Sequence, residues 1–421
     1  MDKFIINGGK TLDGKLEVSG AKNATLALMP AAILAPGKSV LMNTPELNDV
    51  FTMIKLLNHL GADINFSNHI LTIDTSKIAD FVAPYEHVKK MRASVYVLGP
   101  LLGRYGKAKV SLPGGCAWGP RPINLHLEAL KKMGAEINLV DGYIEAQAKK
   151  LNGANISFDL SSVGATGNTI MAAVLSKGTT VINNAATEPE ITNLVEFLIK
   201  MGAKIEGKGT KTVTIEGVDE LSPVEIKTIP DRIEAGTLLI AAAMTNGNIT
   251  LTNVDTSLLK AVLLKLESAG CKVEVAEEKI VLDASDLEIK PTNISTSIFP
   301  GYPTDMQAQW TAFMSLAGGK STVCDTIYFD RFKHVPELVR LGANILVNEN
   351  IAIIKGVKEL NGAKVMSTDL RASASLVLAG LAAKGTTEVL RVYHLDRGYQ
   401  RIEEKLSSLG ADIVRVSGKE F

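Results

Sequence analysis

One structural unit is repeated six times along this chain. Each copy has the pattern of an amphipathic helix that ends in a Gly-Ala turn (Gly-Cys in one copy) and leads into a strand. The copies are LLNHLGADINF, LKKMGAEINLV, LIKMGAKIEGK, LESAGCKVEVA, LVRLGANILVN and LSSLGADIVRV, and their turn glycines are Gly61, Gly134, Gly202, Gly270, Gly342 and Gly410. Because the period of roughly 70 residues exceeds that of common solenoid repeats, each copy must be a small module of helices and strands.

Two further elements recur in phase with this turn. A strand led by glycine precedes each amphipathic helix, as in GKSVLMN and GTTVINNA, and a more apolar helix precedes that strand, as in ATGNTIMAAVLSK and RIEAGTLLIAAAMTN. We expect the apolar helices to lie inside, walled by the strands and the amphipathic helices. The pattern therefore predicts an α/β protein of six βαβαββ-type modules, three in each of two similar domains.

The domain boundary is expected where the repeat is interrupted. The chain has 421 residues, enough for two domains, and Pro230 in KTIPDR breaks the pattern midway. Residues 1–21 contain strands with no helix before them, so we expect them to complete the last module. The prediction is one domain of residues 22–229, a second of residues 1–21 plus 230–421, and a double hinge near residues 21 and 229 that lets the domains close around a ligand.

Charge and composition exclude several classes of function. The chain carries 45 basic and 45 acidic residues, so it has no general field for nucleic acid or for an anionic membrane. Its start, MDKFIINGG, lacks a signal peptide pattern, and its longest apolar run, ATLALMPAAILA, is too short to span a bilayer. Three scattered cysteines form neither a disulfide framework nor a zinc motif. We expect a cytoplasmic protein without a metal.

Polar residues gather at the starts of the apolar helices. They are Lys22, Asn23, Arg92, Thr166, Asn168, Asp231, Arg232, Asp305, Asp369 and Arg371. Helix N-termini attract anions, and recurrence at one phase of the repeat predicts a cation-lined cleft between the domains. The alternative is a set of solvated helix ends. Arg331 and Arg397 each follow an aspartate, so a local salt bridge is an equal alternative for them.

One carboxylate and one thiol are candidates for chemistry. Asp305 is pinned by two prolines and a glycine in FPGYPTDMQAQW and could be either a helix cap or a general base. Cys116 lies in LPGGCAWGPRP, an insert that the other modules lack, where glycines and Arg121 could make a mobile loop with an activated thiol. Packing remains the alternative for Cys116. Cys271, in a repeat turn, and Cys324, in a repeat strand, are expected to be core residues.

Nine motifs resemble one enzyme family over essentially the whole chain. They are SGAKNA at 19–24, MRAS at 91–94, LPGGC at 112–116 with RP at 121–122, EPEI at 188–191, PDRIE at 230–234, PTDMQAQ at 303–309, RFKHVPEL at 331–338, TDLRASASLVLAG at 368–380 and DRGYQRIEEKL at 396–405. The chain resembles the UDP-N-acetylglucosamine 1-carboxyvinyltransferases of the EPSP synthase superfamily. The resemblance implies an inside-out α/β barrel of two three-module domains, and transfer of the enolpyruvyl group of phosphoenolpyruvate to UDP-N-acetylglucosamine at the start of peptidoglycan synthesis.

The resemblance also implies roles for individual residues. Catalytic roles fall on Cys116, Asp305, Lys22 and Arg397. Phosphoenolpyruvate contacts are Lys22, Asn23, Arg121 and Arg397 for the phosphate, with Arg331 and Arg371 for the carboxylate. Contacts to the sugar nucleotide are Asn23, Arg92, Arg121, Pro122, Ile123, Asn124, Leu125, Ser162, Val163, Gly164, Asp305 and Ile327. Cys116, in a loop of about residues 111–122, is implied as the general acid, as the site of a 2-(S-cysteinyl)pyruvate O-phosphothioketal adduct and as the target of fosfomycin.

The expected partners are therefore two small molecules, phosphoenolpyruvate and UDP-N-acetylglucosamine, and the covalent inhibitor fosfomycin. No cofactor, nucleic acid or membrane is expected, and the chain is expected to be a monomer. Asn124, Leu160 and Asn48 depart from residues common in relatives, which predicts a changed nucleotide affinity before a changed reaction. Two alternatives stay open: 5-enolpyruvylshikimate-3-phosphate synthase, and an inactive paralogue that binds a UDP-sugar as a regulator.

Overall fold

The computed structural model describes residues 2–89, 91–112 and 123–418. The chain forms two compact units. The continuous unit is Gly20–Ile229, and the discontinuous unit combines Met1–Ser19 with Pro230–Phe421.

The second module of the continuous unit illustrates the repeat. It runs β6 (Val82–Ala83), η2 (Arg92–Val97), α4 (Leu98–Tyr105), β7 (Lys107–Ser111), α5 (Asn124–Lys132), β8 (Glu136–Val140) and β9 (Tyr143–Gln147). Its sheet has the order β6-β7-β9-β8, in which β6 is parallel to β7 and β9 is antiparallel to both of its neighbours. This is the predicted βαβαββ arrangement, with η2 and α4 together as the inner helix.

The other modules of the continuous unit follow the same plan. The first contains α1 (Lys22–Ala31), η1 (Ala32–Leu34), β3 (Lys38–Met42), α2 (Asn48–Leu60), β4 (Asp63–Ser67), β5 (Ile70–Asp74) and β14 (Glu225–Lys227). The third contains β10 (Asn155–Ser157), α6 (Val163–Ala173), β11 (Thr179–Asn183), α7 (Pro189–Lys200), β12 (Lys204–Glu206) and β13 (Thr212–Glu216). A short helix, α3 (Tyr85–Val88), lies between β6 and η2.

The discontinuous unit also has three four-stranded sheets. Its first module contains β2 (Asp13–Glu17), α8 (Arg232–Met244), β15 (Asn248–Thr252), η3 (Thr256–Leu258), α9 (Lys260–Ser268), β16 (Lys272–Ala276) and β17 (Lys279–Asp283). The second contains β18 (Ile294–Ser295), η4 (Thr304–Met306), α10 (Gln307–Met314), β19 (Lys320–Cys324), α11 (Val335–Arg340), β20 (Asn344–Asn348) and β21 (Ile351–Lys355). The third contains β22 (Lys364–Met366), α12 (Leu370–Ala382), β23 (Thr386–Leu390), η5 (Val392–Arg397), α13 (Ile402–Ser408), β24 (Asp412–Ser417) and β1 (Asp2–Asn7).

The opening segment serves two modules, which corrects one expectation. As expected, β1 completes the last module, where it lies between β23 and β24. The second strand, β2, does not join that module but pairs in parallel with β15. In the continuous unit, β14 pairs in parallel with β3 in the same way. Thus β2 belongs to the discontinuous unit, but the chain continues from it into α1 of the continuous unit. Likewise, β14 belongs to the continuous unit, and the chain continues from it into α8 of the discontinuous unit.

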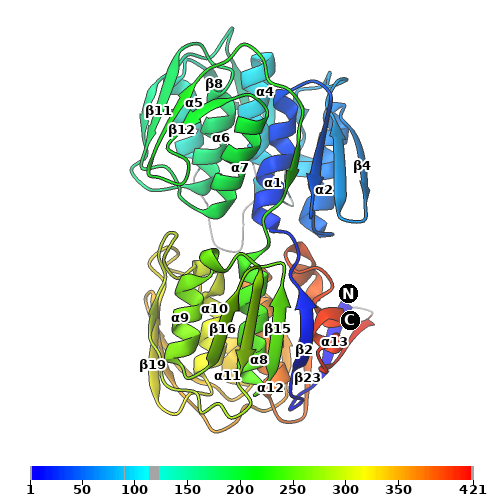
Figure 1. Cartoon of the computed structure of the whole chain (residues 1–421), viewed down its shortest axis with the longest axis vertical. Helices are drawn as coiled ribbons and strands as arrows, with labels where there is room; N and C mark the ends of the chain where they lie inside the picture. Colours follow the sequence, from blue (N-terminus) through cyan, green and yellow to red (C-terminus); the bar gives the residue numbers. More distant parts are fainter. Residues whose placement is uncertain (1, 90, 113–122, 419–421) are drawn as a thin grey trace. The chain divides into compact units, whose positions relative to one another are not determined.

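The inner helices are buried on almost every face, as the sequence predicts. In the discontinuous unit α8, α10 and α12 pack against one another, and the strands surround them (Figure 1). Every residue of α10 is buried, and in α8 only Arg232 is not. All six turn glycines have φ between 92° and 108°, a conformation that other residues rarely adopt. The left-handed turn is therefore the reason that glycine recurs at this phase.

In the part of the chain that the structure describes, no helix is long and apolar enough to cross a lipid bilayer.

Trp310 is the largest fully buried side chain of the discontinuous unit, and its removal should be costly. Its ring lies 5.5 Å from that of Tyr302 and 5.3 Å from that of Phe313, and Nε1 donates a hydrogen bond to the Thr292 carbonyl at 3.2 Å. Trp310→Ala should lower the free energy of unfolding by about 4 kcal/mol, because it opens a cavity and removes a donor. Denaturant unfolding followed by circular dichroism measures this. Phe329→Ala, at a side chain 65% exposed, is the control and should change it by less than about 0.5 kcal/mol.

Candidate active site

Three predicted site residues of the discontinuous unit meet in one ion-pair cluster. Asp305 Oδ1 lies 2.7 Å from Arg331 Nη2, and Asp305 Oδ2 lies 2.8 Å from Arg371 Nη2. The two arginine side chains are only 7% and 6% exposed, whereas that of Asp305 is 27% exposed. One carboxylate therefore bridges two guanidinium groups that are almost completely buried.

Elements of two modules bring these side chains together. Asp305 lies in the 3-10 turn η4, directly before α10. Arg371 is the second residue of α12, whose N-cap Asp369 accepts hydrogen bonds from the backbone N–H groups of Arg371 and Ala372. Arg331 follows β19 in the loop that leads to α11. The helices α10 and α12 are in contact, so the packing of two inner helices helps to bring Asp305 and Arg371 together.

Arg331 is held from behind by a chain of polar contacts. Its Nη1 donates to Thr304 Oγ1 at 2.9 Å, and that hydroxyl donates to Asp325 Oδ2 at 2.7 Å. The Asp325 side chain is completely buried and also accepts hydrogen bonds from Thr296 Oγ1 and from the backbone N–H groups of Ile327 and Tyr328. Asp325 thus fixes both Arg331 and the backbone at Ile327, a predicted contact to the sugar nucleotide. The sequence analysis did not identify Asp325.

Arg371 is anchored to a buried hydroxyl pair. Its Nη1 donates to Tyr399 Oη at 3.2 Å, and Gln309 Nε2 donates to the same oxygen at 3.1 Å. The Thr237 hydroxyl donates to the Ile233 carbonyl, so it accepts the hydrogen bond from the Tyr399 hydroxyl at 2.9 Å. Burial raises the pKa of Tyr399, which keeps the phenol neutral. Tyr399 is a second positioning group that sequence analysis missed.

The two arginines determine the charge state of Asp305. Burial raises the pKa of the Asp305 carboxyl, but the charges of Arg371 and Arg331 outweigh this effect and hold it well below its usual range. In this arrangement Asp305 is ionised and fully engaged. It is therefore a weak base as long as both ion pairs persist.

Sequence analysis left local salt bridges open for Arg331 with Asp330 and for Arg397 with Asp396, but the structure pairs both aspartates with other residues. Asp330 is 85% exposed and lies 3.9 Å from Lys333, while Arg331 pairs with Asp305 on another element. Asp396 pairs with Arg415 at 2.6 Å. The local alternative is therefore wrong for Arg331. Arg397 itself is half-buried at the end of η5, two residues before Tyr399.

In the continuous unit, the residues predicted to contact the sugar nucleotide form a second group. Ile123, Asn124 and Leu125 lie at the start of α5, and Ser162, Val163 and Gly164 lie at the start of α6. The two starts adjoin, because a Cβ added to Gly164 would lie 3.0 Å from His126 Nε2 on α5. Arg92, at the start of η2, is near enough for its charge to lower the pKa of His126 further. Two helix N-termini and one cation are thus brought together.

His126 joins these elements and was missed by the sequence analysis. The backbone N–H of Gly99 donates to Asn168 Oδ1 at 2.6 Å, so Asn168 Nδ2 is the donor to the Val95 carbonyl and to His126 Nδ1, each at 3.0 Å. Burial lowers the pKa of His126 to about 3, so the ring is neutral and carries its proton on Nε2, beside Gly164. A lone histidine in an amphipathic helix gives no sequence signal for this role.

Lys22 is paired within its own unit. Its Nζ lies 2.7 Å from Asp49 Oδ2, and the two side chains are 11% and 5% exposed. Asn23, the next residue of α1, is exposed. Asp49, on α2, is a further charged residue that the sequence analysis did not connect with Lys22.

Other polar residues at the helix starts have structural partners. Thr166 Oγ1 accepts the backbone N–H of Ala186, and Asn168 makes the contacts described above. Asp231 and Asp369 are N-caps of α8 and α12. The expectation that all of these polar groups line a cleft is wrong for Thr166 and Asn168, which are completely buried.

Three predicted residues, Cys116, Arg121 and Pro122, lie outside the described residues, as does most of the loop expected at about 111–122. Of the other cysteines, Cys271 is buried as expected, and burial raises its pKa to about 12. Cys324 is half-buried on the outward side of β19, so its assignment to the core is wrong. Its sulfur lies 3.5 Å from Asn350 Nδ2.

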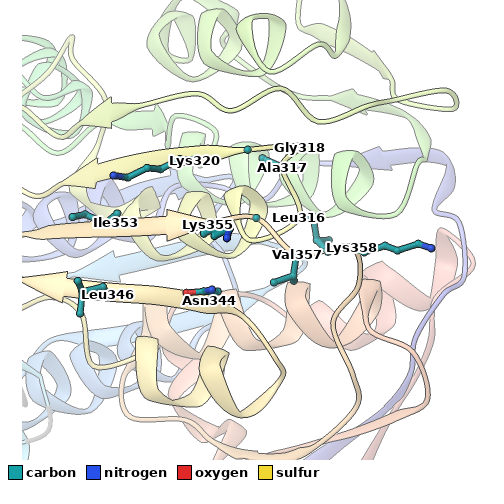
Figure 2. Close-up of a pocket in the computed structure, with 12 residues that line it drawn as sticks. Leu316, Ala317, Gly318, Lys320, Asn344, Leu346, Ile353, Lys355, Val357 and Lys358 are labelled. Carbon is teal, nitrogen blue, oxygen red and sulfur yellow. The ribbon is translucent and has the colours of Figure 1, made fainter.

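A groove of about 740 Å³ lies over β19, β20 and β21 (Figure 2). Lys320, Asn344 and Lys355 are neighbours across its strands, and Leu346 and Ile353 lie beside them. A smaller groove of about 380 Å³ occupies the corresponding corner of the module that contains β7, β8 and β9. The groove is therefore a corner that the repeat itself creates, and it contains none of the predicted site residues.

Among residues 2–89, 91–112 and 123–418, no three histidine, cysteine, aspartate or glutamate side chains gather as a metal-binding set.

Comparison with known sequences identifies the family. The model of the family EPSP synthase (3-phosphoshikimate 1-carboxyvinyltransferase) matches residues 6–406. The UDP-N-acetylglucosamine 1-carboxyvinyltransferase of Chloroherpeton thalassium is 60% identical over 424 residues, which cover 100% of this chain and 99% of that protein. The enzyme of the same name from Chlorobium limicola is 56% identical and is covered completely, as is this chain.

Solved structures agree with this relationship. The enolpyruvyl transferase NikO from Streptomyces tendae superposes with a TM-score of 0.90 at 25% identity, covering 99% of both chains. An EPSP synthase from Acinetobacter baumannii shares the fold, with a TM-score of 0.76 at 17% identity over 99% of this chain and 100% of that one. The inside-out α/β barrel of two three-module units is thereby confirmed. The chain belongs to the EPSP synthase family and, within it, to the UDP-N-acetylglucosamine 1-carboxyvinyltransferases.

Proposed function

We propose that this chain transfers the enolpyruvyl group of phosphoenolpyruvate to the 3'-hydroxyl of UDP-N-acetylglucosamine and releases phosphate, which commits the sugar nucleotide to peptidoglycan synthesis. The observation that carries the proposal is the pair Arg331 and Arg371, whose guanidinium groups already converge on one carboxylate. Such a fork suits the planar carboxylate of phosphoenolpyruvate. Full-length relatives that are 54 to 60% identical and carry this enzyme name support the choice of acceptor.

Resemblance to the family supports roles for groups of both units in the chemistry of addition and elimination. Addition needs a proton at C3 of phosphoenolpyruvate, which makes C2 electrophilic, and the loss of a proton from the 3'-hydroxyl that attacks C2. We assign the first proton to Cys116 and the second to Asp305, by their resemblance to the family's acid and base. The tetrahedral intermediate then loses phosphate and a C3 proton, which restores the enol ether. Arg397, with Lys22, Asn23 and Arg121 of the continuous unit, is assigned to the phosphate.

The continuous unit supports binding of the sugar nucleotide. The N-termini of α5 and α6 adjoin at His126 and Gly164, and Arg92 is close to them. Backbone N–H groups at helix starts together with a cation suit a diphosphate. Leu160, 74% exposed just before α6, stands where relatives often have a lysine. We therefore expect this chain to bind the nucleotide more weakly than those relatives while it performs the same reaction.

The proposal extends to the setting of the enzyme. We propose a cytoplasmic monomer that needs no metal or organic cofactor and that fosfomycin alkylates at Cys116. The chemistry supports the absence of a cofactor, because proton transfer and the stabilisation of anions suffice for the reaction.

One assay tests the function directly. Purified protein should release phosphate from phosphoenolpyruvate when UDP-N-acetylglucosamine is present, and should release none with shikimate 3-phosphate. Release with shikimate 3-phosphate alone would assign the chain to the other synthase of this fold. Release with neither acceptor would favour the inactive regulatory paralogue and refute the proposal.

A further inference from the structure

Asp305 binds the two arginines in the way a substrate carboxylate would. Each of its oxygens receives one Nη2 group, from Arg331 at 2.7 Å and from Arg371 at 2.8 Å. The second Nη of each arginine is turned inward, to Thr304 and to Tyr399. The donors aimed at Asp305 are therefore the ones that a ligand carboxylate needs, and a carboxylate on a small molecule has the same charge and the same spacing of its two oxygens.

The arginines are fixed, whereas the aspartate is the accessible partner. Thr304 and the buried Asp325 hold Arg331, while Tyr399 with Gln309 holds Arg371. Both guanidinium side chains are less than a tenth exposed, but that of Asp305 is 27% exposed. A ligand carboxylate that binds these anchored arginines can reach the same Nη2 donors only if Asp305 gives them up.

Resting on the function proposed above, we infer that Asp305 is an internal competitor for the carboxylate of phosphoenolpyruvate. It occupies Arg331 and Arg371 until the substrate carboxylate takes its place, and this exchange frees Asp305 for the 3'-hydroxyl of the acceptor. Binding of one substrate thus makes the base for the other available.

The exchange also explains how one residue can be both a salt-bridge partner and a base. While the two cations bind Asp305, they stabilise its ionised form and make it a poor proton acceptor. When the substrate carboxylate takes the place of Asp305 on the arginines, it offsets their charge, and the pKa of Asp305 moves back towards its usual range. The proton of the 3'-hydroxyl then passes to Asp305 as the hydroxyl oxygen bonds to C2.

The test measures the binding of an unreactive carboxylate. The probes are 2-phosphoglycolate, which carries both a phosphate and a carboxylate, and ethyl phosphate, which carries only the phosphate. Each is titrated by ligand-observed NMR into wild type, Asp305→Asn and Asp305→Ala, without nucleotide. Asp330→Asn is the matched control, since it removes one negative charge beside Arg331 from a side chain that is 85% exposed.

The inference predicts that loss of the internal carboxylate tightens binding. If the state with free arginines is a minor one, Asp305→Asn and Asp305→Ala should bind 2-phosphoglycolate at least about tenfold more tightly than wild type. Ethyl phosphate should gain less than about twofold, and Asp330→Asn should leave both affinities within about twofold. Unchanged or weaker binding of 2-phosphoglycolate would overturn the inference, as would an equal gain for the two probes.

A second measurement uses the wild-type protein alone, so it does not depend on how the variants fold. A crystal structure with 2-phosphoglycolate should show its carboxylate on Arg331 and Arg371, and Asp305 more than about 4 Å from both. Retention of both ion pairs in that complex would refute the exchange. Phosphate release by wild type with UDP-N-acetylglucosamine is assayed separately, so failure of the proposed function is distinguishable from failure of this inference.

Discussion

Arg371→Ala should lower kcat/KM for phosphoenolpyruvate by about a thousandfold, equivalent to about 4 kcal/mol of transition-state stabilisation. The guanidinium is one of two groups that converge on the carboxylate position, and it is only 6% exposed. Its loss leaves Asp305 with a single cation and leaves Tyr399 without its charged donor. Steady-state kinetics with each substrate varied in turn measures the effect, which should fall mainly on phosphoenolpyruvate.

Two further variants test whether the effect depends on the guanidinium group of Arg371. Arg371→Lys keeps the charge, but its single ammonium group cannot serve both Tyr399 and a carboxylate oxygen in the same geometry, so we expect a loss of about a hundredfold. Arg340→Ala is the control, because that arginine is 58% exposed and contacts Glu337 and the Lys364 carbonyl. It should stay within about twofold of wild type. If Arg371→Ala kept more than a tenth of wild-type kcat/KM, the carboxylate assignment would be wrong.

The sequence was sufficient to predict the fold at the level of the repeat. The six turn glycines could be identified because a left-handed turn strongly favours glycine, and the inner helices because they are apolar on almost all faces. The pairing of β2 with β15 and of β14 with β3 was not predictable. These short strands are interchangeable by composition, and only tertiary pairing determines which sheet each joins.

The individual cations of the site were predictable, but their partners were not. Motifs placed Asp305, Arg331 and Arg371 in a substrate site. The carboxylate nearest in sequence to Arg331 is Asp330, but the actual partner, Asp305, lies 26 residues away on another element of the same module. Ion pairs such as this one form between side chains that the fold brings together from distant positions, and spacing along the chain does not reveal them. Buried positioning groups such as Asp325 escape detection for the same reason, because each looks like an ordinary strand-end residue.

The second large effect concerns the thiols, and it separates Cys116 from the other two. Cys116→Ala should lower kcat by at least about a thousandfold, because proton delivery to C3 loses its donor, and it should abolish modification by fosfomycin. Cys271→Ala and Cys324→Ala should retain both turnover and modification. Mass spectrometry of the intact and digested protein locates the adduct, and phosphate release reports turnover.

The structure gives independent reasons for the two controls. Cys271 is 5% exposed, and burial raises its pKa to about 12, so almost no thiolate is present at neutral pH. Cys324 is half-buried on β19, where Asn350 Nδ2 lies 3.5 Å from its sulfur, and it lies on none of the elements that carry Asp305 or Arg371. We therefore expect an epoxide to modify Cys116 rather than either of these two thiols. A fully active Cys116→Ala protein, or a fosfomycin adduct on Cys271 or Cys324 in wild type, would refute the assignment of Cys116 as the acid and the target.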